Sequence, residues 1–187
     1  MKKKTSKELL MESILELSET RTMDKITVKD IAANCGLTTQ TFYNHFRDKD
    51  DLVLFIHKDY VRKKLEQIGE NGYSYRDVTR DHLSFYWQHR KFLLNAILHT
   101  HGHDAYYLSF NRFAVELTAE LICKWHHLEK LSDELYTYLR FYVYGAMQLF
   151  AVWAYEESPI PKPEKMDYLL NSIPAPLRPY LLPEEQG

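Results

Sequence analysis

The chain has 187 residues, 45% of them hydrophobic, which suffices for one ordinary domain or for a small domain joined to a larger one. Its net charge of −2 gives by itself no indication of a nucleic-acid partner. Two cysteines are too few for a disulfide framework. No apolar run approaches the roughly 20 residues of a membrane span, and we expect a cytoplasmic protein without a membrane partner.

Proline placement predicts an all-α protein. All seven prolines lie at or beyond Pro159, so no proline interrupts a helix before that point. Alternating runs of Val, Ile and Thr, which are typical of strands, are nearly absent. We expect a three-helix domain over residues 1–65 and a larger α-helical bundle over residues 66–187, joined at the glycine-containing stretch 69–77.

The first expected helix covers residues 6–20, because Leu10, Ile14 and Leu17 recur on one face. Ser6 is its expected N-cap.

Two short helices joined by a tight turn are predicted next. Thr27 and Asp30 have the spacing of a capping box, with Asp in place of the usual Glu. Gly36 follows the apolar stripe of that helix, at the position of a left-handed residue that ends it. Thr38 is a suitable N-cap for the second helix. A further helix is expected to start at Asp48. This is the order of a helix-turn-helix.

The second short helix separates two kinds of side chain. Phe42 and Phe46 lie four residues apart, so both can anchor one side of the helix. The other side carries hydrogen-bonding groups with almost no charge, namely Thr39, Gln40, Tyr43 and Asn44. Such groups can enter a major groove about 12 Å wide and meet the base edges. The alternative is a small helical hairpin with an ordinary polar face.

The segment ITVKDIAANCGLTTQTFYNHFRDKDDLV, at residues 26–53, resembles the N-terminal signature of the TetR/AcrR family of bacterial regulators. The matching residues are Thr27, Asp30, Ile31, Ala32, Gly36, Thr41, Phe42, Tyr43, His45, Phe46, Lys49 and Leu52. The resemblance covers about a third of the chain. It implies a DNA-binding head on an α-helical body that dimerises and usually binds an effector.

The resemblance also implies residue roles. Thr39, Gln40 and Tyr43 match the groove-facing positions of the family, and Lys29 matches a position that reaches a base or a phosphate in some members. Positions that contact the DNA backbone are matched by Thr27, Thr41, His45 and Lys49. Asn44 lies at a variable position. The predicted DNA-binding set is Thr27, Lys29, Thr38, Thr39, Gln40, Thr41, Tyr43, Asn44, His45 and Lys49.

The body contains a long helix, predicted over residues 132–157, that is apolar on almost every side. A helix of this kind needs a second surface to cover it, and an identical subunit is the simplest source. The stripe predicted to form a homodimer interface consists of Phe141, Gly145, Gln148, Leu149 and Val152. Two heads related by a twofold axis would bind a palindromic operator in double-stranded DNA.

Aromatic residues crowd the body and suit a largely apolar small-molecule effector, although most of them are expected in the core. The candidate effector-binding residues are Tyr86, His89, Phe110 and Tyr144. A metal sensor is a further alternative, since imidazole and thiolate bind zinc, copper and nickel. Its candidate ligands are His99, His101, His103, Cys123, His126 and His127. A polar turn explains these residues as well, and we predict neither a metal nor a cofactor.

Catalytic motifs such as GxSxG, HExxH and a phosphate-binding glycine loop are absent from the sequence, so we do not expect an enzyme. The expected function is a ligand-responsive DNA-binding repressor. The alternative is a DNA-bound adaptor or activator whose signal is a partner protein. The tail from Asn171 onward carries four prolines and is expected to be non-helical, either packed as an extended strap or forming a polyproline-type strip.

Overall fold

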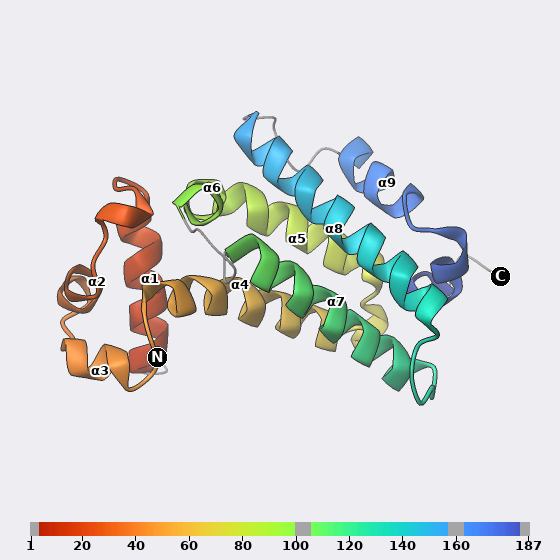
Figure 1. Ribbon diagram of the computed structural model, residues 1–187, viewed down its shortest axis with the longest axis horizontal. Coiled ribbons are helices and arrows are strands. Elements are labelled where there is room, and N and C mark those ends of the chain that lie inside the picture. Colours follow the sequence, from red (N-terminus) through yellow and green to blue (C-terminus); the bar gives the residue numbers. More distant parts are fainter. Residues whose placement is uncertain (1–3, 100–105, 157–162, 184–187) are drawn as a thin grey trace. The chain divides into compact units, whose positions relative to one another are not determined.

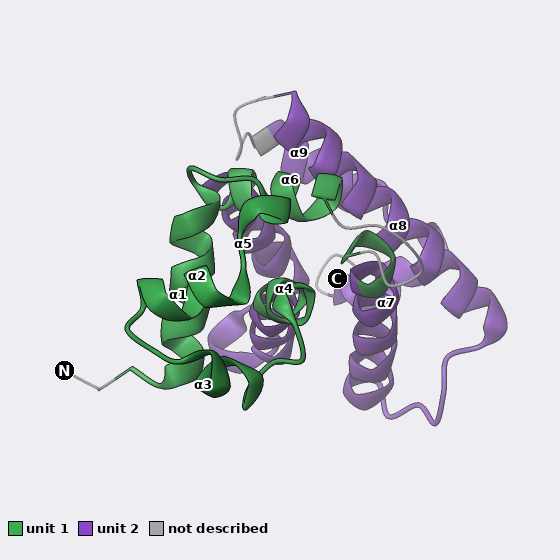
Figure 2. Cartoon of the chain, turned by 60° about the vertical axis from the view of Figure 1, so that its left-hand side comes forward, with its two compact units in different colours: residues 1–57, 89–109 green, residues 58–88, 110–187 purple. Residues whose placement is uncertain are grey.

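The computed structural model describes residues 4–99, 106–156 and 163–183. Within these ranges the regular structure is helical and no strand occurs, which confirms the all-α prediction (Figure 1). The described chain forms two compact units (Figure 2). Unit 1 consists of residues 1–57 and 89–109, and unit 2 of residues 58–88 and 110–187.

Unit 1 holds the short N-terminal helices and one helix from later in the chain. Its elements are α1 (Ser6–Ser18), η1 (Met23–Lys25), α2 (Val28–Asn34), α3 (Thr39–Tyr43), the first part of α4 (Lys49–Glu66) and α6 (Arg90–His99). Helices α1, α2 and α3 pack against one another, and α6 packs against α1 and η1. The polypeptide leaves unit 1 within α4 and returns to it at α6.

The N-cap of α1 is Thr5, so the prediction of Ser6 was wrong by one residue. The Thr5 hydroxyl accepts a hydrogen bond from the Glu8 N–H (3.2 Å), and the Glu8 carboxylate accepts one from the Thr5 N–H (2.7 Å). Glu8 stands three residues after Thr5, so only Thr5 can complete this reciprocal pair.

Phe42 anchors α3 to the core of unit 1. Its side chain is fully buried, and Phe46 retains only 3% of its exposure. The centroids of the two rings lie 5.8 Å apart, and Phe46 in turn contacts Phe55 of α4 at 5.5 Å. Leu10 and Ile31, from α1 and α2, are likewise fully buried. The predicted apolar anchor of the second short helix is therefore confirmed.

Unit 2 is built from longer helices. They are the second part of α4, η2 (Glu70–Gly72), α5 (Tyr75–Gln88), most of α7 (Tyr106–Trp125), α8 (Asp133–Tyr155), α9 (Pro163–Asn171), η3 (Ala175–Leu177) and α10 (Arg178–Leu181). Helix α5 packs against α8 and α9. Ser132 caps α8 by accepting a hydrogen bond from the Leu135 N–H at 3.2 Å. None of the helices in the described ranges is both long enough and apolar enough to traverse a bilayer.

The C-terminal tail differs from the non-helical segment that we expected. Residues 175–181 form η3 and α10, and Leu177, Leu181 and Leu182 are buried. Pro176 and Pro179 occupy the first turns of these two elements. Proline is tolerated there because the first N–H groups of a helix have no partner within the helix. The proline spacing therefore interrupts the tail without preventing helical turns.

We predict that Phe42→Ala lowers the free energy of unfolding of unit 1 by about 3–5 kcal/mol, because it leaves a cavity where a fully buried ring was. Urea denaturation followed by circular dichroism measures the loss. Tyr43→Ala is the matched control, since the next ring in the same helix is 56% exposed and its removal should cost less than about 1 kcal/mol. Equal losses in the two variants would contradict the anchoring role of Phe42.

Candidate nucleic-acid interface

Helix α2 begins and ends with the two motifs predicted for it. The Thr27 hydroxyl donates to Asp30 Oδ2 (2.6 Å) and accepts from the Asp30 N–H (3.1 Å), while the Thr27 N–H donates to the same carboxylate (2.9 Å). Gly36 has a φ of +70°. Its N–H donates to the Ala33 carbonyl (3.1 Å), and the Leu37 N–H donates to the Ala32 carbonyl (2.8 Å). This pair of bonds is a Schellman motif, and it sets the sharp turn into α3.

The capping box affects the ionisation of Asp30. The hydrogen bond from the Thr27 hydroxyl is the main cause that lowers the pKa of this carboxyl, and the hydrogen bond from the Thr27 N–H lowers it further. Both bonds stabilise the carboxylate form. At neutral pH the start of α2 thus carries a fixed negative charge that favours the N-terminus of a helix.

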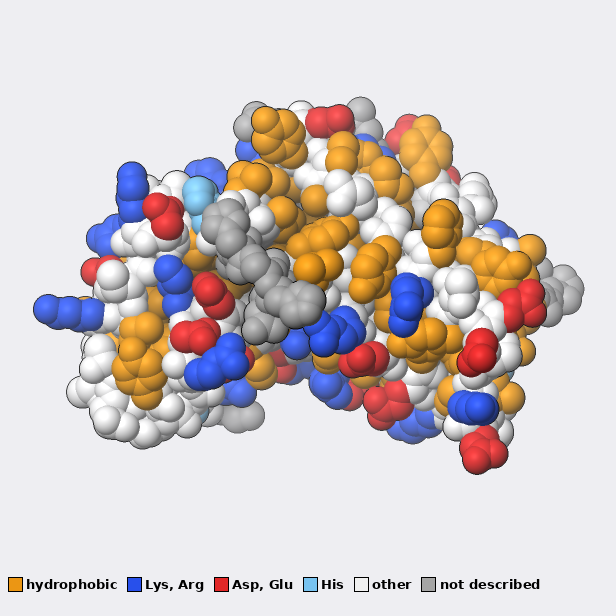
Figure 3. Space-filling view, viewed as in Figure 1, with side chains coloured by type: hydrophobic (Ala, Val, Ile, Leu, Met, Phe, Trp, Pro, Cys, Tyr) orange, Lys and Arg blue, Asp and Glu red, His pale blue; other side chains and the backbone are white. Residues whose placement is uncertain are grey.

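Helix α3 presents an uncharged polar surface. Thr38 caps it by accepting a hydrogen bond from the Thr41 N–H at 3.1 Å, as predicted. With Phe42 turned into the core, the exposed side chains are Thr39, Gln40, Tyr43, Asn44 and His45. Gln40 Nε2 donates to Asn44 Oδ1 at 3.2 Å, one turn further along. In Figure 3 the surface over α3 is mostly free of charged side chains. The structure thus brings together, on α3 and the residues that flank it, most of the residues predicted to contact DNA.

The basic residues near α3 differ in how free they are to reach a phosphate. Lys29, on α2, is exposed. Arg47 is exposed and its Nε forms an ion pair with Asp48 at 2.9 Å. The ammonium group of Lys49 is already engaged, since it donates to the carbonyls of Met23 and Ile26. Lys49 therefore holds the segment before α2 in place, which its position in the sequence did not reveal.

Asn95 of α6 is a second residue that sequence reasoning missed. Its side-chain oxygen accepts a hydrogen bond from the Met23 N–H (2.8 Å), and its nitrogen donates to the Arg21 carbonyl (2.9 Å). Lys91, one turn earlier on α6, forms an ion pair with Glu19 at 3.2 Å. These contacts tie α6 to the connection between α1 and α2. No local pattern could have indicated them, because the partners lie more than 70 residues apart.

The four candidate effector residues are divided between the two units. Tyr86 and Phe110 are almost fully buried, Tyr144 is partly buried, and His89 belongs to unit 1 whereas the other three belong to unit 2. Tyr86 stacks on Phe150 with ring centroids 4.6 Å apart. The cavity beside Phe150 in this aromatic core has a volume of only about 50 Å³. A larger pocket of about 620 Å³ lies elsewhere in unit 2.

The predicted dimer stripe lies on the outer face of α8. Phe141 is 78% exposed, Leu149 is 38% exposed, and Gly145 and Gln148 are exposed as well, while Val152 is partly buried. No atom lies within 4 Å of the place where a Cβ on Gly145 would stand. The opposite face, with Leu139, Val143 and others, is buried in unit 2. Figure 3 shows hydrophobic side chains gathered over α8. Within the single chain, one side of α8 is therefore covered by unit 2 and the predicted stripe remains open to solvent.

The metal-sensor alternative receives no support from the described residues, in which no group of three or more His, Cys, Asp or Glu side chains is placed to hold an ion. His101 and His103 lie outside the described ranges. His99 Nδ1 lies 3.7 Å from Asp24 Oδ1, and His126 Nε2 lies 3.1 Å from the Tyr180 carbonyl oxygen. Cys123 is a free cysteine that is partly buried.

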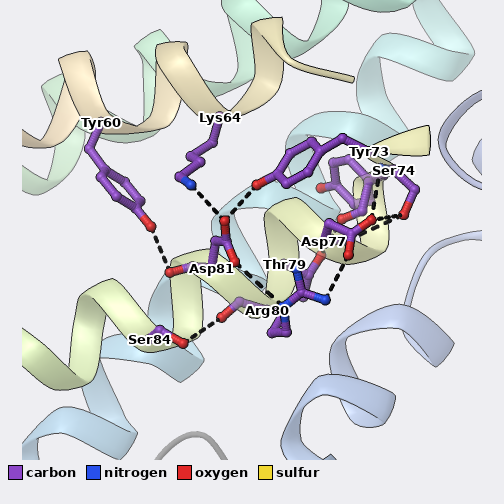
Figure 4. Close-up of polar contacts among 10 residues, drawn as sticks. Tyr60, Lys64, Tyr73, Ser74, Asp77, Thr79, Arg80, Asp81 and Ser84 are labelled. Atoms are coloured by element: carbon purple, nitrogen blue, oxygen red, sulfur yellow. Dashed lines mark hydrogen bonds and ion pairs between the residues drawn. The ribbon is translucent and has the colours of Figure 1, made fainter. Parts of the chain in front are cut away.

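A cluster of polar contacts fixes the start of α5 in unit 2 (Figure 4). Asp81 accepts hydrogen bonds at one carboxylate oxygen from Lys64 Nζ (2.6 Å) and from the Tyr73 hydroxyl (2.7 Å). Its backbone carbonyl accepts one from the Tyr60 hydroxyl at 2.8 Å. Asp77 binds the N–H and hydroxyl of Ser74. The second half of α4, the α4–α5 loop and α5 are thereby joined.

The N-terminal part of the chain matches a family of known proteins. Residues 10–56 match the model of the bacterial regulatory proteins of the tetR family. No curated protein matches the chain.

Three solved structures have a similar fold. The dihydroxyacetone kinase operon activator DhaS shares 15% identity, with a TM-score of 0.67, over 89% of this chain and 95% of that one. A TetR transcriptional regulator from Rhodococcus sp. RHA1 shares 13%, with a TM-score of 0.63, over 88% and 91%. The TetR family repressor AlkX from Dietzia sp. strain DQ12-45-1b, implicated in n-alkane biodegradation, shares 15%, with a TM-score of 0.50, over 95% of each chain. At these identities the likeness shows the fold.

The buried histidine of unit 2 predicts a pH dependence of stability. Burial lowers the pKa of His82 to about 3, so the folded state binds its proton less readily than the unfolded state, whose pKa is about 6.5. The neutral His82 therefore contributes fully to the free energy of unfolding above pH 6.5, and this contribution is lost as the pH falls toward 3. We expect the free energy of unfolding to fall by about 1 kcal/mol between pH 6.5 and 5.5.

Urea unfolding at pH 7.0, 6.5 and 5.5 measures this dependence. In His82→Phe the free energy of unfolding should change less with pH than in the wild type. The exposed control His45→Gln should show the wild-type change with pH. An unchanged slope in His82→Phe would show that another group causes the loss.

Proposed function

From the premise that this chain is a TetR-family DNA-binding transcription regulator, we propose that it acts as a homodimer on a palindromic operator and, as a repressor, is released by an effector. In this proposal residues 1–65 form the DNA-binding domain. Residues 66–187 form the effector-binding and dimerisation domain. The protein works in the cytoplasm, where a bacterial operator is located, and acts by binding without catalysis.

The observation that carries the proposal is the division of α3 into a buried and an exposed side. Phe42 is fully buried, so the helix cannot rotate about its axis without exposing the ring. The exposed side then holds Thr39, Gln40 and Tyr43 toward solvent in a fixed order. An amide can form two hydrogen bonds to adenine, and a hydroxyl can meet several bases, so these groups can distinguish sequences in the major groove.

The remaining predicted residues suit contacts to the DNA backbone. Thr38 stands at the N-terminus of α3, where N–H groups and the helix dipole favour a phosphate, whereas Thr27, at the N-terminus of α2, shares its position with the Asp30 carboxylate. Lys29 and His45 are exposed beside them. Thr41 and Asn44 extend the polar surface of α3, and Lys49 supports it by holding the segment before α2. Contacts of this kind orient the protein on the duplex, whereas α3 supplies the sequence preference.

The exposed apolar face of α8 supports the homodimer. Phe141 and Leu149 expose large apolar surface, which is costly in water and is removed when a second copy covers it. A twofold dimer places the same face of α8 from each subunit together, so one stripe serves both partners. Two heads in such a dimer would contact half-sites roughly 34–36 Å apart along the duplex.

The effector acts through the dimer in this proposal. An effector that binds one conformation of the body preferentially shifts the population toward it, and release follows if that conformation spaces the heads wrongly. A shift from almost fully bound to almost fully free requires about 5.5 kcal/mol of differential binding.

A second function, a DNA-bound adaptor or activator that responds to a partner protein, is favoured by one observation. The cavity lined by His82, Tyr142 and Phe150 has a volume of about 50 Å³, well below the roughly 300 Å³ that small-molecule pockets usually have. An activator is known among the structures of similar fold, DhaS of a dihydroxyacetone kinase operon. A body without an effector pocket would suit this function, so a test of ligand binding in the larger pocket of unit 2 would distinguish the two functions.

Selection of bound duplexes from a random pool tests the DNA-binding role. We expect a palindromic consensus for the wild-type protein. Gln40→Ala should relax one position of each half-site, because the lost bidentate contact is worth about 1–3 kcal/mol of discrimination. Glu70→Ala, on an exposed residue of η2, is the control and should give the wild-type consensus. No enrichment with the wild-type protein would refute the proposal, and an unaltered consensus with Gln40→Ala would remove that residue from the contact set.

Phe141→Glu tests the dimer interface. A carboxylate in place of this exposed ring should separate the subunits, because burying the charge without a partner costs several kcal/mol. Analytical ultracentrifugation at micromolar concentration should show a dimer for the wild type and a monomer for the variant. Leu128→Glu places the same charge at an exposed apolar residue outside α8 and should remain dimeric. A dimer in both variants would place the interface elsewhere.

A further inference from the structure

We propose that unit 2 binds an uncharged, planar aromatic molecule in the pocket of about 620 Å³ between the α4–α5 loop, the C-terminal end of α7 and the C-terminal tail. The inference rests on the proposed function in one respect, since this molecule serves as the effector. The pocket lies away from the aromatic residues that the sequence indicated. Its volume falls within the range of about 300–1,000 Å³ typical of small-molecule sites.

The α4–α5 loop forms a wall in which the backbone is open to a ligand. Gly69 and Gly72 both line the pocket and have φ values of +92° and +76°. Nothing lies within 4 Å of the place where a Cβ on either glycine would stand. The loop is nevertheless held in shape, because the Gly69 N–H donates to the Tyr73 carbonyl at 2.8 Å. A flat molecule can therefore approach this backbone closely.

Tyr73 gives the same wall an aromatic ring in a fixed orientation. Its hydroxyl donates to Asp81 Oδ2, which also accepts from Lys64 Nζ (Figure 4). The adjacent Ser74 is bound by Asp77 through both its N–H and its hydroxyl. A ring held in this way loses little freedom when a ligand packs on it, which favours binding.

The tail and α7 form the facing wall. His126 Nε2 lies 3.1 Å from the Tyr180 carbonyl oxygen, and the two rings meet edge to face with centroids 5.1 Å apart. Leu181, which also lines the pocket, is 2% exposed and fixes α10 in the core of unit 2. Trp125, the last residue of α7, adds a third large ring to this side. The helical turns of the tail thus contribute directly to the pocket.

The chemistry of the lining selects the class of ligand. Four aromatic side chains line it, from Tyr73, Tyr75, Trp125 and Tyr180. Three polar groups of the lining are already engaged within the protein: the Tyr73 hydroxyl by Asp81, the Ser74 hydroxyl by Asp77 and the His126 ring by the tail. Arg76, the one lining residue that always carries a charge, also has contacts within the protein.

A charged ligand would therefore lose hydration among these rings, and the one lining side chain of fixed charge, Arg76, already has contacts within the protein. A planar aromatic ligand would gain offset-stacked or edge-to-face contacts with several rings.

Helix α4 connects the wall of this pocket to the N-terminal helices along the chain. Lys64, which shares the Asp81 carboxylate with Tyr73, belongs to α4. Helix α4 begins at Lys49, shortly after α3 ends at Tyr43. A ligand packed on Tyr73 strengthens the arrangement in which Asp81 holds α4, and α4 is the continuous helix through which the chain passes from unit 1 to unit 2. This gives the bound molecule a direct means of influencing the DNA-binding end of the chain.

The test uses two dyes that differ by one charge, N-phenyl-1-naphthylamine, which is uncharged, and 1-anilinonaphthalene-8-sulfonate, which adds a sulfonate. Each is titrated against the full chain without DNA, and fluorescence gives the affinity. We expect saturable binding of the uncharged dye at one site per chain and at least about tenfold weaker binding of the sulfonate. Equal affinities for the two dyes would overturn the assigned ligand class.

Two variants locate the site. Tyr180→Ala and Trp125→Ala each remove a ring from the lining and should weaken binding of the uncharged dye by about tenfold. Tyr168→Ala, on a ring that is 60% exposed on α9 and outside the lining, is the matched control and should bind the dye as the wild type does. Thermal unfolding checks that each variant is folded, and Tyr180→Ala, at a partly exposed residue, keeps the test valid if Trp125→Ala does not fold.

Binding to the selected duplex, measured without dye, separates this inference from the proposed function. If Tyr180→Ala binds the duplex normally and its affinity for the dye is unchanged, the proposed ligand pocket is wrong and the proposed DNA-binding function is not affected. Saturable, variant-sensitive dye binding by a protein that binds no duplex would support the pocket and refute the regulator.

Discussion

Burial of Phe42 is the interaction on which the DNA-binding end of the molecule depends. The ring is fully removed from water, and Phe46 beside it links α3 to Phe55 of α4. A helix of five residues has too few internal hydrogen bonds to be stable alone, so its orientation comes from this packing. The Schellman turn at Gly36 and the cap at Thr38 then fix where α3 begins. With these constraints in place, Gln40 and Tyr43 are exposed to solvent, and the hydrogen bond from Gln40 to Asn44 restrains the first of them.

The body follows a different principle, in which polar clusters hold an aromatic framework. Asp81 joins α4, the α4–α5 loop and α5 through three side chains, while the cavity beside Phe150 in the aromatic core holds only about 50 Å³. A cavity of this size has little space for a ligand. A larger pocket lies at the end of unit 2, between the loop glycines and the helical tail. In the proposed function, a short packed helix, α3, contacts the DNA, and an open loop between α4 and α5 contacts the effector.

Local sequence signals predicted the head well, and distant contacts explain what they missed. The capping box at Thr27 and the left-handed Gly36 depend on neighbours within a few residues, so spacing alone indicates them. The engagement of Lys49 by two carbonyls and the bridge made by Asn95 involve partners far away in the sequence, for which no pattern exists. The tail was misjudged because prolines that usually end helices also fit their first turns. The candidate effector residues were chosen by aromatic content, and two of them, Tyr86 and Phe110, are almost fully buried.

Hydrogen exchange of the backbone amides, with and without the selected duplex, measures most directly whether α3 meets DNA. The account predicts that added duplex slows exchange between Leu37 and Phe46 and that α8 shows no change attributable to DNA contact. Slower exchange confined to the body, with residues 37–46 unaffected by a saturating duplex, would contradict the claim that the phenylalanine-anchored helix is the DNA-reading element.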